Sequence, residues 1–353
     1  MNLKDLSAPD ARLLVVDDTP MALNQFKGLL RRSNITLDTA SNGYEALSLA
    51  ASNRYDIIFI DYLMPDMDGT ETLHSIRNMA EDLNSKTPCI VVSGNADADN
   101  ADSWLESGFD DWLSKPVKAN LFCDILIKYI PADKVTDSSV CSSDPPSLDD
   151  TDAPAFFKAF SQLPEIDAVG AVENCGGMDE LKDILNTFSM TGEDSAERIE
   201  QALKNGDISS YTILVHALKS SARLVGAMDL GDAAEKLENA GARQDVDYIN
   251  SHSKTTIDLY RSLSARIGEA LKEGVDKIDD SSLPPITQKR LSGAYQAIYE
   301  LVTADDFDSA RGVAAALSQY RLPPEEKDFF RQLDLLLVRV DRDGIRQLLT
   351  GKY

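Results

Sequence analysis

The strongest constraint on the fold is an alternation of short apolar runs and amphipathic stretches between residues 12 and 130. The runs Leu13–Val16, Ile57–Ile60 and Ile90–Val92 are apolar at consecutive positions. Such runs are typical of central strands that are covered on both faces. Stretches of helical period, such as Met21–Arg32 and Tyr44–Ser52, lie between them. Strand and helix in alternation predict βαβ units and therefore an α/β domain with a parallel sheet.

The strand pattern ends after this first block. Residues 132–151 are rich in Ser, Asp and Pro, which predicts a flexible linker over residues 132–163. Phe156, Phe157 and Phe160 near its end indicate a short helix that packs against another part of the chain. Helical periodicity with short Gly-containing breaks then dominates, and it predicts an all-α bundle of four or five helices, built as a four-helix bundle, over residues 164–275. A second polar joint over residues 276–285 leads to a small helical domain over residues 286–353. The α/β domain is expected over residues 10–131.

The charge and cysteine content narrow the classes of partner and the compartment. The 353 residues include 59 acidic and 35 basic side chains, which gives a net charge of −24. A surface this acidic repels nucleic acid and anionic lipid, so neither is expected as a partner. The four cysteines form no CxxC pair, and neither an 18-residue apolar run nor a secretory signal is seen. We therefore expect a cytoplasmic protein.

Charged residues follow the predicted strands of the first block. Asp17 and Asp18 follow the first strand, Asp61 ends the third, and Lys115 follows the fifth. The carboxyl ends of parallel strands meet at one edge of the sheet. Three carboxylates there repel one another unless a hard cation lies among them, and oxygen-only ligands favour Mg²⁺ or Mn²⁺. A lysine at the same edge can neutralise a bound anion such as a phosphoryl group.

Five motifs in this order resemble the response-regulator receiver domain, and the resemblance covers about the first 130 residues. The motifs are Asp17-Asp18, Asp61, Met64-Pro65-x-Met67-Asp68-Gly69, Ser93-Gly94-Asn95-Ala96, and Asp110-Asp111-Trp112-Leu113-Ser114-Lys115-Pro116. The family fold is a flavodoxin-like, doubly wound five-stranded parallel sheet with the strand order 2-1-3-4-5.

The resemblance implies a role for each residue at the acidic edge. Asp61 is then the phosphoacceptor nucleophile. Asp17 and Asp18 hold Mg²⁺ together with Asp61 and the backbone carbonyl of Leu63. Lys115 binds the phosphoryl oxygens.

Two further residues, Ser93 and Trp112, are implied to form the switch that responds to phosphorylation. The hydroxyl of Ser93 moves toward the phosphoryl group, and the space that it leaves is filled by the aromatic ring. The family usually carries Tyr or Phe where Trp112 stands. Because indole is larger, we expect an incomplete inward rotation.

One of the three histidines has an unusual setting. His74 and His252 lie on polar helix faces and are expected at the surface. His216 lies in the apolar-periodic stretch Tyr211–Val225, with Lys219 about one turn further on the same face. The small residues that follow leave the imidazole approachable. The alternative is an ordinary packed histidine in a bundle that transfers nothing.

The segment His216–Ala227 resembles the histidine phosphotransfer (HPt) domain, and the resemblance extends loosely over residues 164–272. The run Leu230, Ala233, Ala234, Leu237, Glu238 and Ala240 resembles the next helix of that family. By motif, His216 is the phosphohistidine and Lys219 its electrostatic partner. Ser220 replaces the glycine commonly found there and adds bulk beside the docking face.

The two resemblances are complementary halves of one reaction and predict a two-component phosphorelay protein. Asp61 accepts a phosphoryl group from phosphohistidine with Mg²⁺, and His216 carries or relays phosphoryl groups to or from a receiver aspartate. The expected partners are a sensor histidine kinase, another receiver, or both. A flexible linker of about 30 residues spans roughly 30 Å, which also permits contact between Asp61 and His216 within one chain.

Two alternatives stay open at this point. The domain order resembles the C-terminal part of hybrid sensor histidine kinases, so the chain is either a detached relay protein or a fragment of such a kinase. Alternatively, the receiver is a phosphorylation-gated binding module and His216 is inactive. No P-loop and no Gly-rich ATP lid is seen, so we expect no autophosphorylation from ATP. The block after residue 286 predicts no chemistry.

Overall fold

The computed structural model describes residues 6–79, 83–94, 98–137, 153–273, 284–304, 307–317, 320–338 and 342–352. The chain divides into two compact units, Met1–Leu271 and Lys272–Tyr353. Several sequence expectations fall outside the described residues. They concern Asn95 and Ala96, Cys141, positions 138–152 of the linker, and most of the second joint.

The first unit contains a five-stranded parallel sheet. Its spatial order is β3-β2-β4-β5-β6, which is the expected flavodoxin-like order 2-1-3-4-5 when only the strands of this sheet are counted. The strands are β2 (Arg12–Val16), β3 (Thr36–Ala40), β4 (Ile57–Asp61), β5 (Cys89–Ser93) and β6 (Asp111–Ser114). The predicted apolar runs Leu13–Val16 and Ile57–Ile60 lie in β2 and β4, and their residues are almost completely buried.

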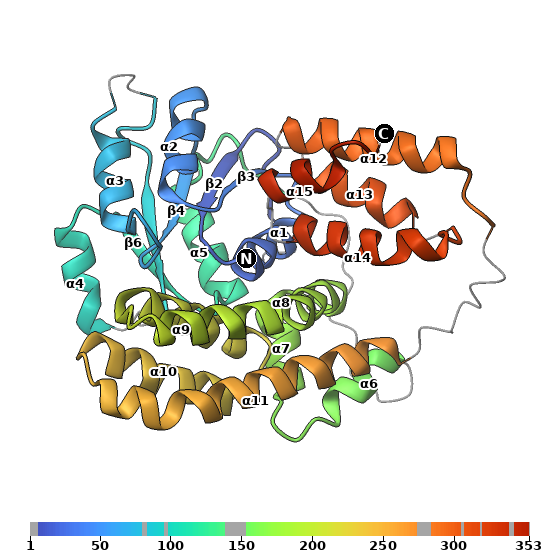
Figure 1. Ribbon diagram of the computed structural model, residues 1–353. Coiled ribbons are helices and arrows are strands. Elements are labelled where there is room, and N and C mark those ends of the chain that lie inside the picture. The colour runs from blue at the N-terminus through green and yellow to red at the C-terminus, as the bar shows by residue number, and fades with distance from the viewer. Residues whose placement is uncertain are drawn as a thin grey trace. The chain divides into compact units, whose positions relative to one another are not determined.

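Helices cover both faces of this sheet (Figure 1). They are α1 (Pro20–Leu30), α2 (Gly43–Ser52), α3 (Gly69–Arg77), α4 (Ala98–Glu106) and α5 (Ala119–Tyr129). The core under α1 and α5 centres on the rings of Phe26, Phe59 and Phe122, whose centroids lie 5.2–5.5 Å apart. A separate core holds α2, α3 and α4 on the other face. Burial on both faces explains the consecutive apolar residues of the strands.

Strand register determines which residues meet at the edge of the sheet. Val16 pairs with Ile60, so the residues that follow, Asp17 and Asp61, come next to each other. Ser93 pairs with Ser114 on the other side of β4, which brings Lys115 to the same edge. The predicted convergence therefore follows directly from the sheet pairing.

A short antiparallel ribbon, which the sequence did not predict, joins the two ends of this domain. It consists of β1 (Leu6–Ser7) and β7 (Thr136–Asp137). The side chain of Leu6 is fully buried in the core under α1 and α5. Strands of two residues are too short to show a period in the sequence.

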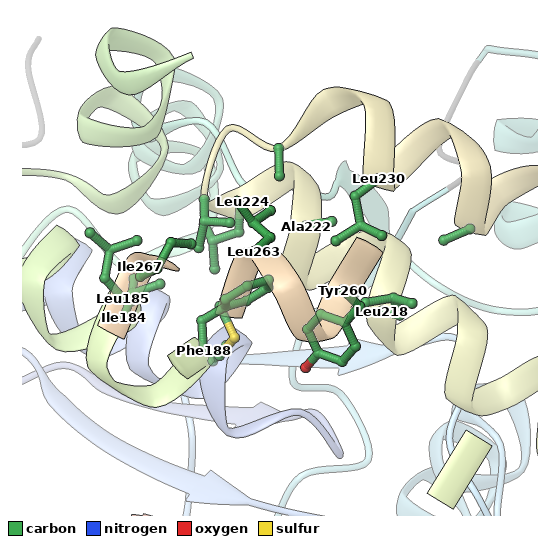
Figure 2. Close-up of a cluster of buried hydrophobic side chains, with 14 of the residues drawn as sticks. Ile184, Leu185, Phe188, Leu218, Ala222, Leu224, Leu230, Tyr260, Leu263 and Ile267 are labelled. Carbon is green, nitrogen blue, oxygen red and sulfur yellow. The ribbon is translucent and has the colours of Figure 1, made fainter. Parts of the chain in front are cut away.

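The second part of the first unit is the expected helical bundle. It comprises α6 (Ala155–Ser161), α7 (Ala168–Cys175), α8 (Met178–Lys204), α9 (Ile208–Leu224), α10 (Met228–Ala242) and α11 (Val246–Lys272). Apolar side chains from α8, α9, α10 and α11 point toward one another in its core (Figure 2). Helix α6 is the short helix expected at the end of the linker range, and its three phenylalanines pack into this same core.

The turn between α9 and α10 depends on a glycine. Gly226 has φ = +77°, a conformation that residues with a β-carbon adopt rarely. A β-carbon there would also meet the backbone oxygen of Asp167 at 2.3 Å. The tight turn lets α9 and α10 pack closely as an antiparallel pair, which brings His216 of α9 next to Glu238 of α10.

The second unit is a separate helical domain. It contains α12 (Gln288–Thr303), α13 (Phe307–Leu317), α14 (Pro324–Val338) and α15 (Arg342–Leu349). Tyr295, Leu333 and Ile345 are fully buried in its own core. Among the described helices of the chain, none is long and apolar enough to cross a membrane.

Candidate functional site

The three aspartates expected at the sheet edge form one cluster. Each of Asp17, Asp18 and Asp61 offers a carboxylate oxygen, and these oxygens all lie within 4.8 Å of one another. Asp17 and Asp61 are each only 1% exposed. The backbone N–H of Thr19 donates to Asp17 Oδ1 at 2.9 Å, which orients that carboxylate just before α1 begins. The donor set is oxygen-only, as a hard divalent cation requires.

Lys115 joins the cluster from the end of β6. Its Nζ lies 2.6 Å from Asp17 Oδ2 and 2.9 Å from Asp61 Oδ1. Burial lowers the pKa of Lys115, but the two carboxylates outweigh it, so the pKa lies above its ordinary value. The ammonium group therefore stays charged and is shared between two acids.

Burial also changes the acids themselves. It raises the pKa of Asp61 to about 7, although Lys115 lowers it. Burial and the neighbouring Asp17 raise the pKa of Asp18 to about 6. One lysine is therefore too little positive charge for three clustered carboxylates, and a second cation would stabilise their ionised forms.

The other residues expected at this site lie around the cluster. Ser93 is buried at the end of β5, and Leu63 lies in the loop two residues after Asp61. Trp112 is partly buried on β6, with its ring centroid 6.3 Å from that of Trp104. Trp104 in turn lies 6.1 Å from Tyr62, which follows Asp61 directly. An aromatic row thus leads away from the acidic cluster.

His216 sits in a second buried ionic group, on α9. Its Nδ1 is 2.7 Å from Glu238 Oε1 on α10, and Lys219 Nζ is 2.6 Å from Glu238 Oε2. Because its partner is a carboxylate, Nδ1 carries a proton and donates it, and in the neutral imidazole the lone pair lies on Nε2. Within the described part of the chain, the buried Nε2 has no hydrogen-bond partner.

Glu238 belongs to this ionic group, and the sequence did not reveal its pairing with His216. Burial raises its pKa, but His216 and Lys219 outweigh this, so its pKa lies below the ordinary value. It is therefore an ionised carboxylate held between an imidazole and an ammonium group. The 22 residues between it and His216 hide the pairing, which only the packing of α9 against α10 creates.

The two ionic groups meet at Gly94. A β-carbon built on Gly94 would lie 3.1 Å from Lys219 Cε and 3.3 Å from His216 Cε1. Gly94 directly follows Ser93 at the acidic edge. When protonated, the His216 ring is also near enough to lower the pKa of Asp61, against the larger effect of burial. The structure thus brings Asp61, Lys115, His216 and Lys219 into one buried region.

Comparison with known proteins agrees with this arrangement. Residues 13–127 match the family of response regulator receiver domains, and residues 183–280 match the Hpt domain family. The chain contains a receiver domain followed by an Hpt domain. These are the domains of two-component phosphorelay signal transduction, and the predicted family and function class are confirmed.

Several individual proteins are similar to parts of this receiver–Hpt chain. Sensor histidine kinase GacS of Pseudomonas protegens is 25% identical over 68% of this chain and 25% of its own length. Transcriptional regulatory protein PrrA of Mycobacterium tuberculosis is 38% identical over 32% of this chain and 46% of its own length. The chain thus spans about a quarter to a half of these relatives.

A solved two-component response regulator from Clostridium difficile is also similar to the receiver. It is 28% identical and covers 33% of this chain and 94% of its own, with a TM-score of 0.30.

Proposed function

We propose that Asp61 and His216 exchange a phosphoryl group, and that this exchange is the chemical step of the relay. The observation that supports it best is the contact at Gly94, where the phosphoryl-transfer residues of both domains come together. In this proposal the receiver covers residues 10–131, the linker 132–163, the Hpt domain 164–275 and the helical tail 286–353.

The step is an in-line displacement at phosphorus. A carboxylate oxygen of Asp61 attacks the phosphoryl group on His216 Nε2, so an O–P bond forms and the N–P bond breaks. Nε2 keeps the electron pair of the broken bond, and the proton stays on Nδ1, where Glu238 accepts it in a hydrogen bond. The reverse step returns the group to His216.

The positive groups of the site hold the charge of the moving phosphoryl group. Lys115 is shared between Asp17 and Asp61 and is placed to bind a phosphoryl oxygen once Asp61 is modified. Lys219, next to His216 and Gly94, serves the group from the Hpt side. Both lysines are almost completely buried, which strengthens their interaction with an anion.

A divalent cation, Mg²⁺ in this proposal, fits the acidic cluster. Asp17, Asp18, Asp61 and the backbone carbonyl of Leu63 would hold it. When bound, the cation supplies charge stabilisation to the phosphoryl oxygens. A bound cation would also keep Asp18 and Asp61, whose pKa values are raised, ionised at neutral pH.

Ser93 and Trp112 form the proposed switch. Ser93 lies between Asp61 and Lys115 along the sheet edge, where its hydroxyl can donate to a phosphoryl oxygen. Trp112 is partly buried, with its ring 6.3 Å from that of Trp104, and indole is larger than the Tyr or Phe ring usual at this position. The structural response in this chain is therefore expected to pass through the row of aromatic rings rather than through a full inward swing.

The phosphoryl donor is proposed to be a sensor histidine kinase. The similarity to sensor histidine kinase GacS over most of this chain supports this partner class. The kinase core then acts either as a separate protein or as another part of the same polypeptide. Genomic sequence upstream of this chain distinguishes the two.

The proposal is tested with phosphoramidate as a small phosphoryl donor. Wild type is expected to form both phosphohistidine and acyl phosphate. Asp61→Asn should form only phosphohistidine on His216, and His216→Gln only acyl phosphate on Asp61. Asp124→Asn and His252→Gln, both at exposed positions, are the matched controls and should behave as wild type. Absence of label from His216 in every variant contradicts the relay.

A further inference from the structure

Helix α1 of the receiver carries a surface that is fitted to the Hpt domain. We define the α1 surface as Met21, Gln25, Gly28 and Arg31. Met21 is 3% exposed and belongs to the hydrophobic core of the Hpt bundle rather than to either core of the receiver. An apolar side chain of the receiver is thus buried among those of the other domain.

Gln25 links the two domains with one amide group. Its Nε2 donates to Val117 O of the receiver at 3.0 Å and to Asn174 O of α7 at 2.6 Å. The side chain is only 2% exposed. Both amide hydrogens are therefore used, one in each domain, and a partner without a carbonyl at this place would leave a buried donor unsatisfied.

Gly28 forms a notch into which the Hpt domain fits. A β-carbon there would lie 2.8 Å from Glu180 Cγ and 3.3 Å from the backbone oxygen of Cys175. The first contact is closer than side chains tolerate, and the second involves backbone that yields little. No other residue type permits this approach of α1 to the start of α8.

Charge completes the match at the end of α1. Arg31 lies 3.0 Å from Glu180 Oε1 and 3.9 Å from Asp179 Oδ2, both in the first turn of α8. One exposed ion pair contributes little stability. The charge of Arg31 does select among partners. A partner that presents an acidic segment here is attracted, and a partner that presents a basic segment is repelled and so excluded.

The docked domains cover the reactive groups of both. His216 is 5% exposed, Lys219 0%, Asp61 1% and Lys115 8%. A cavity between the domains, lined in part by Lys115 and Ser220, has a volume of about 10 Å³, room for roughly one water molecule. A kinase or a second receiver therefore cannot reach Asp61 or His216 while the two domains stay together.

We propose that the α1 surface selects the chain's own Hpt domain and holds the pair in a closed state that excludes other proteins until it opens. This inference rests on the proposed function and adds its regulation. Exchange inside the chain is then the default, and transfer to another protein requires the two domains to separate.

The test measures transfer between two full-length chains. The donor chain carries Asp61→Asn and is labelled on His216 with phosphoramidate, and the acceptor chain carries His216→Gln. Gly28→Ala or Arg31→Glu is placed only in the donor, whose receiver is chemically inert. Any effect on transfer to the acceptor then comes from uncovering His216. Ala is a better helix former than Gly, so Gly28→Ala does not weaken α1 itself.

The expected result is a faster transfer, roughly 5- to 100-fold for Gly28→Ala, as overpacking of a tight contact produces. Arg31→Glu should accelerate transfer less. A donor with both Arg31→Glu and Glu180→Arg restores its own pair and repels the acceptor's Arg31, so it should be slower than Arg31→Glu alone. Gly293→Ala, with nothing within 4 Å, and exposed Arg54→Glu are the matched controls and should change nothing.

Equal transfer rates from all donors that carry label overturn the closed state and leave the proposed function intact. If His216 takes no label in any donor, the proposed function fails, and this inference fails with it.

Discussion

The receiver and the Hpt domain hold a buried nucleophile in two different ways. Asp61 lies beside two other carboxylates, Asp17 and Asp18, and burial raises its pKa to about 7. His216 is a base held by an acid, Glu238, whose pKa is lowered by His216 and Lys219 although burial opposes this. Each site uses one buried lysine. The receiver has an excess of negative charge and needs a cation, whereas the Hpt site has its charges matched by side chains alone.

Removal of divalent cations should separate the two sites most strongly. With a chelator present, labelling of Asp61 by phosphoramidate should fall by about a hundredfold or more, because a bound cation contributes several kcal/mol of charge stabilisation. Labelling of His216 should stay within about twofold. The measurement is the initial rate of each phosphorylated species, in His216→Gln and Asp61→Asn chains respectively. An equal loss of labelling at both sites would contradict the claim that only the receiver site requires a cation.

Loss of the buried carboxylate should affect only the Hpt site. Glu238→Ala leaves His216 Nδ1 without its acceptor and Lys219 without its counter-ion, and we expect labelling of His216 to slow by about 10- to 100-fold. Glu238→Gln keeps an acceptor oxygen and should lose less. The rate for Asp61 in the same chains is the internal control. If Glu238→Gln is as slow as Glu238→Ala, a positioning role for the carboxylate is wrong.

The pH dependence of cation binding should sharpen the comparison further. Asp61 and Asp18 have folded-state pKa values of about 7 and about 6, above the ordinary value for aspartate. Protons therefore compete with the cation, and affinity should rise as pH increases from about 5 to 8. The stability of the receiver without cation should change with pH in the opposite direction. Because the folded state binds more protons than the unfolded state, the receiver should become more stable as pH falls through this window. Isothermal titration with Mg²⁺ at several pH values measures the first effect, and thermal unfolding measures the second. Affinity that does not change with pH would contradict the raised pKa values.

The smallest expected effect is a change in tryptophan fluorescence. Trp104 and Trp112 are the only tryptophans in the sequence, and both lie in the aromatic row that begins at Tyr62. Phosphorylation of Asp61 should change tryptophan emission, and Trp112→Phe should remove most of that change. Phosphorylation of His216 in an Asp61→Asn chain should leave the emission nearly unchanged. A response carried by Trp104 alone would exclude Trp112 as the switch residue.

Sequence patterns were sufficient to predict the features that depend on a single stretch of the chain. The strands at Leu13–Val16 and Ile57–Ile60, and the carboxylates that follow them, were predicted because buried parallel strands are apolar at every position. The placement of Lys115 beside Asp61 followed from the same logic. Helix α9 and His216 were evident from an apolar helical period that contains one imidazole.

Features created by packing between distant segments were not predictable. Glu238 reaches His216 only because Gly226 permits a tight turn between α9 and α10. The notch at Gly28 has no sequence signal, since a glycine within a helix reads as a weak helix position. The ribbon formed by Leu6 and Thr136 joins residues far apart in the chain. The roles of the individual site residues remain predictions.

Exchange between Asp61 and His216 within one chain is the central claim, and a dilution series tests it directly. His216 of the wild-type chain is labelled with phosphoramidate in the presence of a chelator, the donor is removed, and excess Mg²⁺ starts the transfer. Loss of acid-labile phosphohistidine and gain of base-labile acyl phosphate are followed over about a hundredfold range of protein concentration. Exchange within one chain predicts a rate constant that does not depend on concentration. A rate that rises in proportion to concentration would show that the two residues meet only between chains and would contradict the claim.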